Sequence, residues 1–477
     1  MRGGSIAVVG GSIAGCAFAR AAARGGAERV VVLERSPGRL EDRGVGLCVV
    51  VDRYTELVRA GHLDDGIRHH PLTERHWLAR DTGGSRGRGG TGGSRGTGGS
   101  RGRPLWTQPL LMHSFHWGVL WQALRERAPD GVEFRTGTTV TAVGGDGDAA
   151  WLETAGGGRE AYDLVVGADG YRSVVRTVVC PEARPEYAGY VCWRGSFDAG
   201  LLEGLPGGAA LWPEHEVITV CFPGGQVVLY RIPGLAAGST QVNWVFYAPA
   251  PRWLRPADAG AGRSTAGAGP DGSPAGAGPD GPSGDSGDSQ DSRHGANHGD
   301  GGHLTSDPGG IPAGSLDPAR FGELAELAER HLPPYWAGVV NLTPVERTFL
   351  QPIHDLATPR RSAGRLLLAG DAATLVRPHN TSGAAKALQD ACAFEEAWHS
   401  SAGFAELLPA YDRERGEAGR ALVDLGRRLG RFQVTEAPDW SAMDESAMTA
   451  WWREQLAGTG GFGGLALGRP PTPRQNP

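Results

Sequence analysis

A glycine-rich turn near the N-terminus is the first stretch of the sequence whose residues could do chemistry. Residues 8–15 read VVGGSIAG, between a short apolar run and a segment, CAFARAAARGG, with a helical pattern. A turn that binds the pyrophosphate of a dinucleotide usually reads G-x-G-x-x-G, and this chain has Ser12 in place of the middle glycine. The serine is small, and its hydroxyl could itself bond a phosphate at the helix N-terminus. We expect the phosphate to be bound by Gly10, Gly11, Ser12, Ile13, Ala14 and Gly15.

An acidic residue follows this turn at the distance at which dinucleotide-binding folds hold a ribose. Glu34 ends the apolar run RVVVLE, 19 residues after Gly15, and Arg35 comes next. A carboxylate at the tip of that strand can accept hydrogen bonds from the hydroxyls of an adenosine ribose. The order strand, glycine turn, helix, strand therefore predicts a site for an ADP-containing cofactor, to which we assign both residues. The alternative is a tight strand-to-helix turn that binds nothing.

Two later segments decide between NAD and FAD. Residues 132–166 alternate like a β-meander and lead into the sequence GADG, which contains Asp169 and Gly170. Near residue 365 a second apolar strand, RLLLAGDAA, ends in Gly370-Asp371. A loop with the sequence RPHNTSG then precedes a long helix that we expect to begin near Gly383. A plain NAD-dependent dehydrogenase would share the first turn but would not explain these two segments.

The three segments, in this order and at this spacing, resemble the FAD-dependent aromatic-ring hydroxylases, the single-component flavoprotein monooxygenases of the p-hydroxybenzoate hydroxylase fold. The chain looks most like the 2,6-dihydroxypyridine 3-hydroxylase branch, whose first turn also reads GGSI. Four further segments are similar to that branch: YAGYVCWRG (187–195), NWVFY (243–247), FLQPIHD (349–355) and RPHNTSGAAKA (377–387). Ser12 is then a variant of the phosphate-binding turn rather than its loss.

The resemblance implies a set of cofactor contacts. Glu34 would hold the adenosine ribose, and Asp371 would bond the ribityl chain. Asp169 and Gly170 would lie near the pyrophosphate and the incoming nicotinamide. Arg43, in EDRGVGL, would lie beside the flavin ring and ribityl. The turn at Ser382 and Gly383 would open a helix toward the pyrimidine edge of the flavin, where a helix N-terminus stabilises negative charge.

The resemblance also implies a reaction. NADH or NADPH reduces FAD, FAD reacts with O₂ to give a C4a-hydroperoxide, and one oxygen atom is transferred to an electron-rich ring of the phenol or hydroxypyridine type. His379 and the Pro378 carbonyl are the catalytic candidates, because a histidine can accept a proton near pH 7. Candidate substrate residues are Trp193, Asn243, Tyr247, Gln351 and His354, although aromatic residues in such a sheet belong more often to the core than to a pocket.

The chain departs from the family pattern at two places. The loop before the last helix usually reads P-x-x-G-x-G, and here Thr381 stands at the first of these glycines. The helix in MHSFHWGVLWQAL lacks an arginine that often contacts FAD. The first departure keeps open a catalytically inactive flavin-binding scaffold. A flavin-dependent halogenase or another FAD oxidoreductase is a further alternative, although no W-x-W-x-I-P motif is present.

The composition restricts the kinds of partner that we expect the protein to bind. The chain has 477 residues, a net charge of −6 and 40% hydrophobic residues, and none of its apolar runs has the length of a membrane span. We expect no nucleic-acid or membrane partner, no metal, and a monomer or homodimer that binds a small aromatic substrate. The apolar N-terminus is interpreted as a strand rather than a signal peptide. Six scattered cysteines without C-x-x-C favour reduced thiols in a cytoplasmic protein.

We predict an α/β protein in which a Rossmann-like FAD-binding domain is interleaved with a β-sheet substrate domain, followed by C-terminal helices. Two low-complexity segments lack the apolar residues needed for a core and are predicted to be disordered. The first resembles an RNA-binding RGG tract but has no interleaved aromatics, and the second contains His294, His298 and His303 without a nearby cysteine. The predicted ranges are 1–70, 104–184 and 343–400 for the FAD-binding domain, 185–342 for the substrate domain with its insert at 257–316, 82–103 for the Gly/Arg loop, 401–455 for the helices and 456–477 for a flexible tail.

Overall fold

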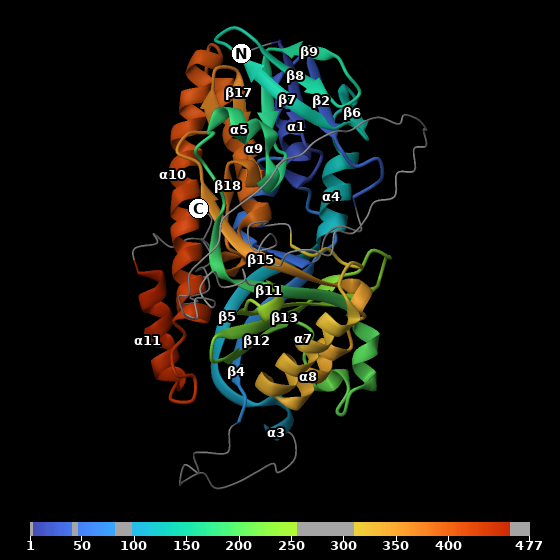
Figure 1. Ribbon diagram of the computed structural model, residues 1–477, viewed down its shortest axis with the longest axis vertical. Helices are drawn as coiled ribbons and strands as arrows, with labels where there is room; N and C mark the ends of the chain where they lie inside the picture. Colours follow the sequence, from blue (N-terminus) through green and yellow to red (C-terminus); the bar gives the residue numbers. More distant parts are fainter. Residues whose placement is uncertain (1–2, 41–45, 82–97, 255–309, 458–477) are drawn as a thin grey trace, which may run out of the picture.

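The computed structural model describes residues 3–40, 46–81, 98–254 and 310–457. Arg43, the three histidines of the second insert, most of both inserts and nearly all of the predicted tail lie outside the described residues. The described residues form two large sheets, one above the other in Figure 1, and a small three-stranded sheet, and a long helix runs along both large sheets. No helix in these ranges is both long enough and apolar enough to cross a membrane.

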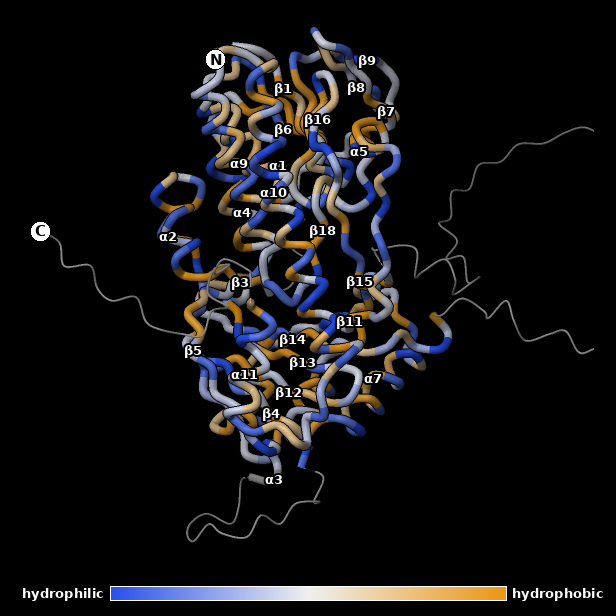
Figure 2. The backbone as a smooth tube through the Cα atoms, turned by 90° about the vertical axis from the view of Figure 1, so that its left-hand side faces the viewer, coloured by the Kyte–Doolittle hydropathy of each residue, from blue (hydrophilic) through white to orange (hydrophobic). Residues whose placement is uncertain are grey.

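The upper sheet has six strands in the order β16-β17-β10-β1-β2-β6. Its four central pairs, from β17 to β6, are parallel. Buried parallel strands are apolar on both faces, and Figure 2 shows hydrophobic segments gathered around β1. The strands are β1 (Ser5–Val9), β2 (Arg29–Glu34), β6 (Val132–Thr136), β10 (Leu164–Gly167), β16 (Ser362–Ala363) and β17 (Leu366–Leu368).

Helices cover one face of this sheet, and a small sheet covers the other. Helices α1 (Ile13–Gly25), α4 (Trp117–Glu126) and α9 (Gly383–Ser400) pack on the side of Ile6 and Val8. Helix α5 (Val174–Val179) and a three-stranded antiparallel sheet cover the side of Ala7 and Val9. The small sheet consists of β7 (Val140–Gly145), β8 (Ala150–Thr154) and β9 (Arg159–Tyr162).

The meander predicted over residues 132–166 is therefore correct only in its middle. Its first and last strands, β6 and β10, leave it and pair in parallel with β2 and β1. Alternation along the chain cannot reveal this, because the partner of a strand is set by tertiary packing.

The lower sheet has nine strands in the order β18-β15-β11-β14-β13-β12-β4-β5-β3. Its outer face packs on α7 (Pro318–His331) and α8 (Pro334–Asn341). We call the opposite face, which carries Tyr190, Cys192 and Tyr247, the inner face. The strands are β3 (Gly46–Val50), β4 (His70–Ala79), β5 (Arg103–His116), β11 (Glu186–Asp198), β12 (Glu216–Phe222), β13 (Gly225–Pro233), β14 (Thr240–Pro249), β15 (Thr348–Ala357) and β18 (Thr374–Leu375).

The C-terminal helices join the two sheets. Helix α10 (Phe404–Gly430) packs against α9 above and β15 below, and α11 (Glu445–Leu456) packs on β5. Between them lies a π-helical turn, η9 (Arg431–Thr435), against β13. These elements cover part of the inner face of the lower sheet.

The predicted fold class is confirmed, but several boundaries differ from the predicted ranges. Strands β3, β5 and β15 fall in ranges assigned to the FAD-binding domain, and all three pair within the lower sheet. The short helix α3 (Gly98–Arg101) and the first residue of β5 occupy the end of the predicted loop at 82–103. Ile311, inside the predicted insert, pairs with Leu350, and α11 ends inside the predicted tail. Residues 98–103 and Ile311 are thus ordered by contacts with distant residues, although their local composition favours a loop.

Candidate functional site

The first glycine turn lies at the carboxyl end of β1, where α1 begins. Gly10 has φ of 101°, and a Cβ there would lie 2.4 Å from the carbonyl oxygen of Ala168. A Cβ on Gly15 would lie 1.8 Å from the carbonyl oxygen of Gly10, so both glycines are required by close backbone packing. The first bond within α1 runs from the Cys16 N–H to the Ser12 carbonyl. The N–H groups of the first turn, from Ser12 to Gly15, therefore remain for a ligand at this end of the helix.

Glu34, at the end of β2, is hydrogen-bonded to this turn. Its Oε2 accepts a hydrogen bond from the Gly11 N–H at 2.9 Å, and its Oε1 accepts one from the Ser36 N–H at 2.9 Å. The two bonds fix the carboxylate beside the turn, and each oxygen keeps capacity for a further donor. Arg35 follows it and is exposed.

Asp169 lies against the same turn from β10. A Cβ on Gly10 would be 3.0 Å from the Asp169 Cα. Its Oδ2 accepts from the Val174 N–H at 2.7 Å, which caps α5, while its buried Oδ1 has no partner among the described residues. Burial raises the pKa of this carboxyl. Gly170 follows with φ of 75°. Asp169 thus caps the start of α5 through Oδ2, and its Oδ1 has no hydrogen-bond partner among the described residues.

The second turn, Gly370-Asp371, is brought directly onto the first. A Cβ on Gly370 would lie 2.8 Å from the Ala14 Cβ in α1. The Gly370 N–H donates to Oδ2 of Asp390 at 3.0 Å, and Oδ1 of Asp390 accepts from Arg415 at 2.8 Å. Asp390 is completely buried, so α9 and α10 hold the turn through a buried ion pair.

Asp371 is partly exposed on this turn and forms an ion pair. The Lys386 ammonium, which is completely buried in α9, lies 2.9 Å from Asp371 Oδ1. It also donates to the Thr374 carbonyl. Sequence reasoning placed Asp371 correctly after a buried strand but missed Lys386. Its spacing of 15 residues from Asp371 carries no signal until α9 is folded back on the turn.

In the loop before α9 the chain departs from the family pattern at Thr381, and this residue has an unusual backbone conformation. Thr381 has φ of 53° and is the only non-glycine residue with positive φ among those described. This is the position at which the family pattern has glycine. Ser382 donates through its hydroxyl to the Asn380 carbonyl at 2.8 Å, and α9 begins at Gly383 without an acidic residue in its first turn. Thr381 thus adopts a left-handed backbone conformation that is unfavourable for a β-branched residue.

His379 is held against the inner face of the lower sheet. Its Nε2 lies 2.8 Å from the Tyr190 hydroxyl, and its ring stacks on Tyr247 with ring centroids 4.2 Å apart. Burial lowers the pKa of His379 to about 3, and the nearby Arg377 contributes. The expectation that this histidine accepts a proton near pH 7 does not fit this environment, in which the imidazole is neutral and acts as a hydrogen-bonding group. Pro378 begins the same 3₁₀ turn.

The loop is anchored by a second buried carboxylate. Asp355 of β15 is completely buried and accepts from Arg377 Nε at 2.7 Å and from Arg427 Nε at 2.8 Å. Arg377 directly precedes Pro378. The position of the loop is therefore fixed by β15 and α10 together.

The predicted substrate residues lie on different faces of the lower sheet. Tyr247 and Asn243 lie on the inner face, and the Asn243 amide oxygen accepts from the Gly46 N–H at 2.8 Å. Gln351 pairs with Cys192 and shares that face. Trp193 lies on the outer face, in the core with α7 and α8, with its ring centroid 6.5 Å from that of Trp253. Assigning Trp193 to the substrate was wrong, because the alternation of a strand directs neighbouring residues to opposite faces.

His354 is separated from the other candidates by a β-bulge. The register between β11 and β15 shifts between Tyr187 and Val191, and His354 pairs with Tyr187 beyond that shift. Its Nδ1 lies 3.2 Å from the Pro352 carbonyl. Tyr190, which sequence reasoning did not select, takes the position beside His379. Its occurrence in YAGYVCW, two residues before Cys192, is the only signal that could have pointed to it.

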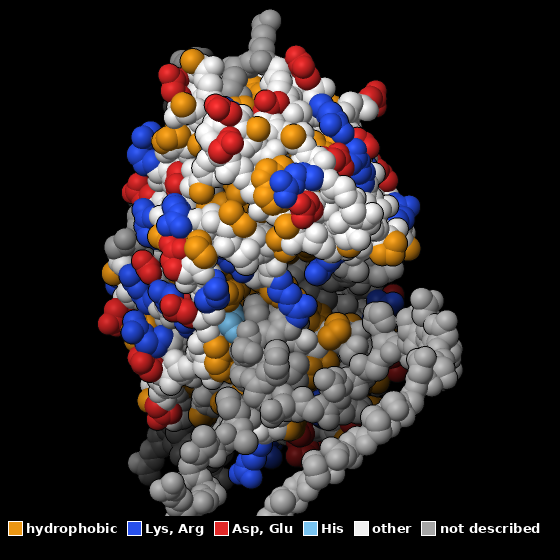
Figure 3. All heavy atoms as spheres, turned by 45° about the horizontal axis from the view of Figure 1, so that its top comes forward, with side chains coloured by type: hydrophobic (Ala, Val, Ile, Leu, Met, Phe, Trp, Pro, Cys, Tyr) orange, Lys and Arg blue, Asp and Glu red, His pale blue; other side chains and the backbone are white. Residues whose placement is uncertain are grey.

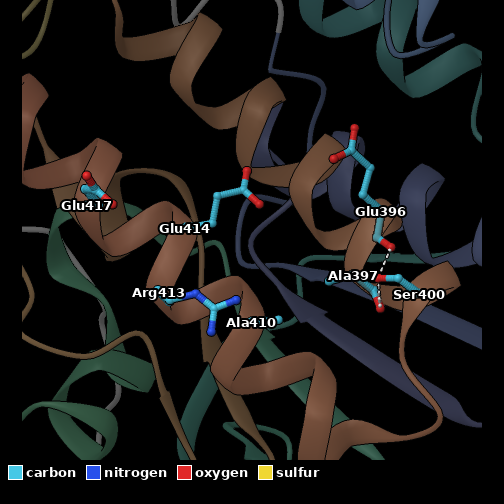
Figure 4. Close-up of a pocket in the computed structure, with 7 residues that line it drawn as sticks. All are labelled: Glu396, Ala397, Ser400, Ala410, Arg413, Glu414 and Glu417. Atoms are coloured by element: carbon cyan, nitrogen blue, oxygen red, sulfur yellow. Dashed lines mark hydrogen bonds between the residues drawn. The ribbon is translucent and has the colours of Figure 1, made fainter.

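The groove in Figure 4 lies elsewhere, between α9 and α10. Glu396 and Ser400 extend from one helix, and Arg413 and Glu414 from the other. None of the predicted site residues lines it.

The residues that meet between the two sheets fit an FAD molecule. Two glycine turns, Glu34 and the first turn of α1 lie together, and within the described part of the chain no donor reaches the buried Oδ1 of Asp169. The start of α9, with no acidic residue in its first turn, leads from the loop that meets the inner face. An extended cofactor with a pyrophosphate centre and a ring at one end suits this arrangement.

Comparison with known proteins supports the same cofactor. The family model of the FAD binding domain matches residues 339–425. The 2,6-dihydroxypyridine 3-monooxygenase of Paenarthrobacter nicotinovorans is 24% identical over 427 residues, which cover 89% of this chain and 90% of that protein. The 3-amino-4-hydroxybenzoate 2-monooxygenase PtmB3 of Streptomyces platensis is 30% identical over 276 residues, covering 54% of this chain and 61% of that protein.

Solved structures show the same fold. The 2,6-dihydroxypyridine-3-hydroxylase from Arthrobacter nicotinovorans superposes with a TM-score of 0.68 at 22% identity, covering 93% of this chain and 96% of its own. HpxO of Klebsiella pneumoniae, solved with FAD and uric acid, gives a TM-score of 0.62 at 18% identity, covering 94% and 92%. The family resemblance found in the sequence is confirmed: the chain carries a match to the FAD binding domain, is similar in sequence to aromatic-ring monooxygenases, and shares the fold of solved hydroxylases.

Proposed function

We propose that this protein hydroxylates an electron-rich aromatic or heteroaromatic ring of the phenol or hydroxypyridine type, with consumption of O₂ and of NADH or NADPH. The observation that carries the proposal is the meeting of the loop at 377–382 with the inner face of the lower sheet, through His379, Tyr190 and Tyr247. The same loop leads into α9, whose Lys386 holds the second glycine turn. Cofactor and substrate residues thus share one loop.

FAD would supply the redox chemistry when bound, by the flavin hydroperoxide route that the resemblance implies. One oxygen atom of O₂ enters the ring and the other leaves as water, while NADH or NADPH supplies two electrons. The chain would hold the adenosine ribose through Glu34, the pyrophosphate at the first turn of α1, and the ribityl chain through Asp371. Asp169, whose Oδ1 has no hydrogen-bond partner among the described residues, would lie near the incoming nicotinamide, as the resemblance implies.

The residues on the inner face would orient the ring and its hydroxyl group. A neutral His379 with its Nε2 on Tyr190 can relay a hydrogen bond to the ring hydroxyl, while the Pro378 carbonyl can accept one. Tyr247 closes the back of His379 and excludes water from that side. Gln351 and Asn243 would border the ring on the same face.

We also propose that the protein works as a cytoplasmic monomer or homodimer without a nucleic-acid partner. The net charge of −6 supports the last point, as does the mixture of basic and acidic side chains on the face in Figure 3.

Purification and a substrate screen test the proposal. The protein should be yellow and hold one FAD per chain that heat or acid releases without cleaving a covalent bond. Candidate phenols and hydroxypyridines should stimulate NADH or NADPH oxidation and yield a product heavier by about 16 Da, the mass of one oxygen atom, in keeping with a monooxygenase reaction. Protein that binds FAD but oxidises neither nucleotide with any ring would support the inactive scaffold instead.

A further inference from the structure

A tryptophan on α4 is hydrogen-bonded to the first glycine turn. The Trp121 indole is buried, and its Nε1 donates to the Gly11 carbonyl at 2.8 Å. The N–H of the same glycine donates to Glu34. The Cys16 thiol, a weak donor, lies 3.4 Å from the Gly11 carbonyl oxygen. Gly11 is therefore held from two sides, by a side chain from α4 and by one from the end of β2.

The bond from Trp121 fixes a peptide group of the turn that we expect to bind phosphate. A trans peptide is planar, and its carbonyl and its N–H point in opposite directions. The peptide that contains the Gly11 carbonyl also contains the Ser12 N–H, the first of the N–H groups that remain for a ligand at the start of α1. Because the carbonyl is held, the direction of this N–H is fixed as well. A hydrogen bond to the carbonyl also polarises the peptide and makes its N–H a stronger donor.

The turn itself contributes little that would hold this peptide in place. Gly11 has no Cβ to restrict the rotation of its carbonyl, and Gly10 before it has φ of 101°. The Ser12 side chain makes no capping bond to α1. A Cβ on Gly11 would lie 3.0 Å from the Glu34 Cβ, so a stiffer residue fits there only if Glu34 moves. The orientation of the peptide therefore depends on α4.

The neighbouring Trp117 is an indole in the same helix without this contact. It lies one helical turn before Trp121, and the two rings are stacked, with centroids 6.3 Å apart and planes 6° apart. Trp117 is a partly buried ring packed on the apolar core, whereas the N–H that reaches the turn belongs to Trp121. The two indoles share a helix and a stack, and they differ in their contact with Gly11.

Building on the proposed function, we propose that Trp121 is a positioning residue for the pyrophosphate of FAD. It acts through the peptide between Gly11 and Ser12, whose N–H it directs toward a phosphate oxygen. The sequence of α4 lacks the arginine that would contact FAD directly, and the helix contributes through the glycine turn instead. Trp121 then affects the adenosine and pyrophosphate half of FAD and leaves the flavin half unchanged.

Trp121→Phe tests this role, because it keeps an aromatic ring and removes the N–H. The probes are FAD and ADP, which contains the pyrophosphate and the adenosine but no flavin. Flavin fluorescence and calorimetry on the full-length chain freed of FAD give the two dissociation constants. Both should rise by the same factor, roughly three- to tenfold, the effect of losing one neutral hydrogen bond. The absorbance spectrum of the bound flavin should stay as in the wild type.

Trp117→Phe is the matched control, since it makes the same change in the same helix and should leave both dissociation constants unchanged. Circular dichroism shows whether each variant is folded. If Trp121→Phe does not fold, benzothienylalanine at position 121 takes its place, because this analogue keeps the shape of the indole and has sulfur in place of the N–H.

The proposal is overturned if the altered residue 121 leaves FAD affinity as in the wild type, if FAD is weakened and ADP is not, if the flavin spectrum shifts, or if Trp117→Phe causes an equal loss. These measurements require cofactor binding alone. If they fail while a phenol or hydroxypyridine still stimulates NADH or NADPH oxidation by the wild type, the proposed function stands and only the role of Trp121 falls.

Discussion

The ammonium of Lys386 lies 2.9 Å from Oδ1 of Asp371, and the two ends of this ion pair differ in burial. The Lys386 side chain is completely buried, whereas the Asp371 side chain is 46% exposed. Asp371 therefore has two tasks in the proposed site: its exposed side is available to the ribityl chain, and its inner side compensates a buried cation. Because of this ion pair, we expect Asp371 to contribute to the stability of the apoprotein as well as to FAD binding.

Asp371→Ala should weaken FAD binding by about ten- to a hundredfold, since a charge-assisted hydrogen bond contributes about 1.5–3 kcal/mol. It should also lower the free energy of unfolding of the apoprotein by roughly 1–3 kcal/mol, a loss moderated by the exposure of the carboxylate. Fluorescence titration with FAD and urea unfolding measure the two effects. Adding Lys386→Met should restore stability but not FAD affinity, and wild-type FAD affinity in Asp371→Ala would show that the turn is misassigned.

Thr381→Gly should stabilise the protein. Thr381 has φ of 53°, and a left-handed conformation costs an ordinary residue about 1–2 kcal/mol of folding free energy. Glycine removes this cost, but its greater flexibility in the unfolded chain offsets about half of the gain. We expect a gain of roughly 0.5–1 kcal/mol in the free energy of unfolding, seen as a rise in the urea midpoint, with FAD retained. Thr381→Val, which stays β-branched, should give no gain. A lower midpoint for the glycine variant would mean that the threonine side chain contributes more than its backbone strain costs.

His379 should make stability depend on pH below neutrality. Its pKa is lowered from 6.5 to about 3 by burial, so the unfolded chain takes up this proton before the folded one does. The contribution is complete above pH 6.5 and is lost as the pH falls toward 3, with a slope of up to about 1.4 kcal/mol per pH unit. Urea unfolding at several pH values should show a shallower slope for His379→Gln. His113, whose pKa is lowered to about 4, titrates in the same window in both proteins and cancels in the difference. Equal slopes would place His379 in contact with water.

Deletion of the first insert should succeed only if it stops before α3. Ala79 pairs with Arg103, so the ends of the loop already lie together, and removing residues 84–97 should leave folding and FAD binding intact. A deletion that extends to residue 101 should cost stability. It removes Arg101, whose carbonyl accepts from the Trp336 indole at 2.9 Å and whose guanidinium lies 3.3 Å from Glu216. Thermal unfolding of the two deletion variants measures the difference, and identical midpoints would show that α3 contributes nothing.

The sequence by itself determined the features that depend on short stretches of chain. Strand, turn and helix around Gly10 follow one another without interruption, and Glu34 reaches the Gly11 N–H because only one helix separates them. The position of Asp371 after a buried strand, the start of α9 at Gly383 and the missing glycine at Thr381 were also readable locally. Such features are set by backbone propensity and by sterics between near neighbours.

The tertiary structure decided which side chains share a face and which strands share a sheet. A bulge in β11 and the alternation of the strand direct Tyr190 toward His379 and Trp193 into the outer core, although both are aromatic residues in one segment. The Lys386 ammonium gains its carboxylate partner only in the folded chain, where α9 lies against the turn that carries Asp371. Pairing and burial arise from contacts between residues far apart in the chain, and local composition does not encode the register that brings them together.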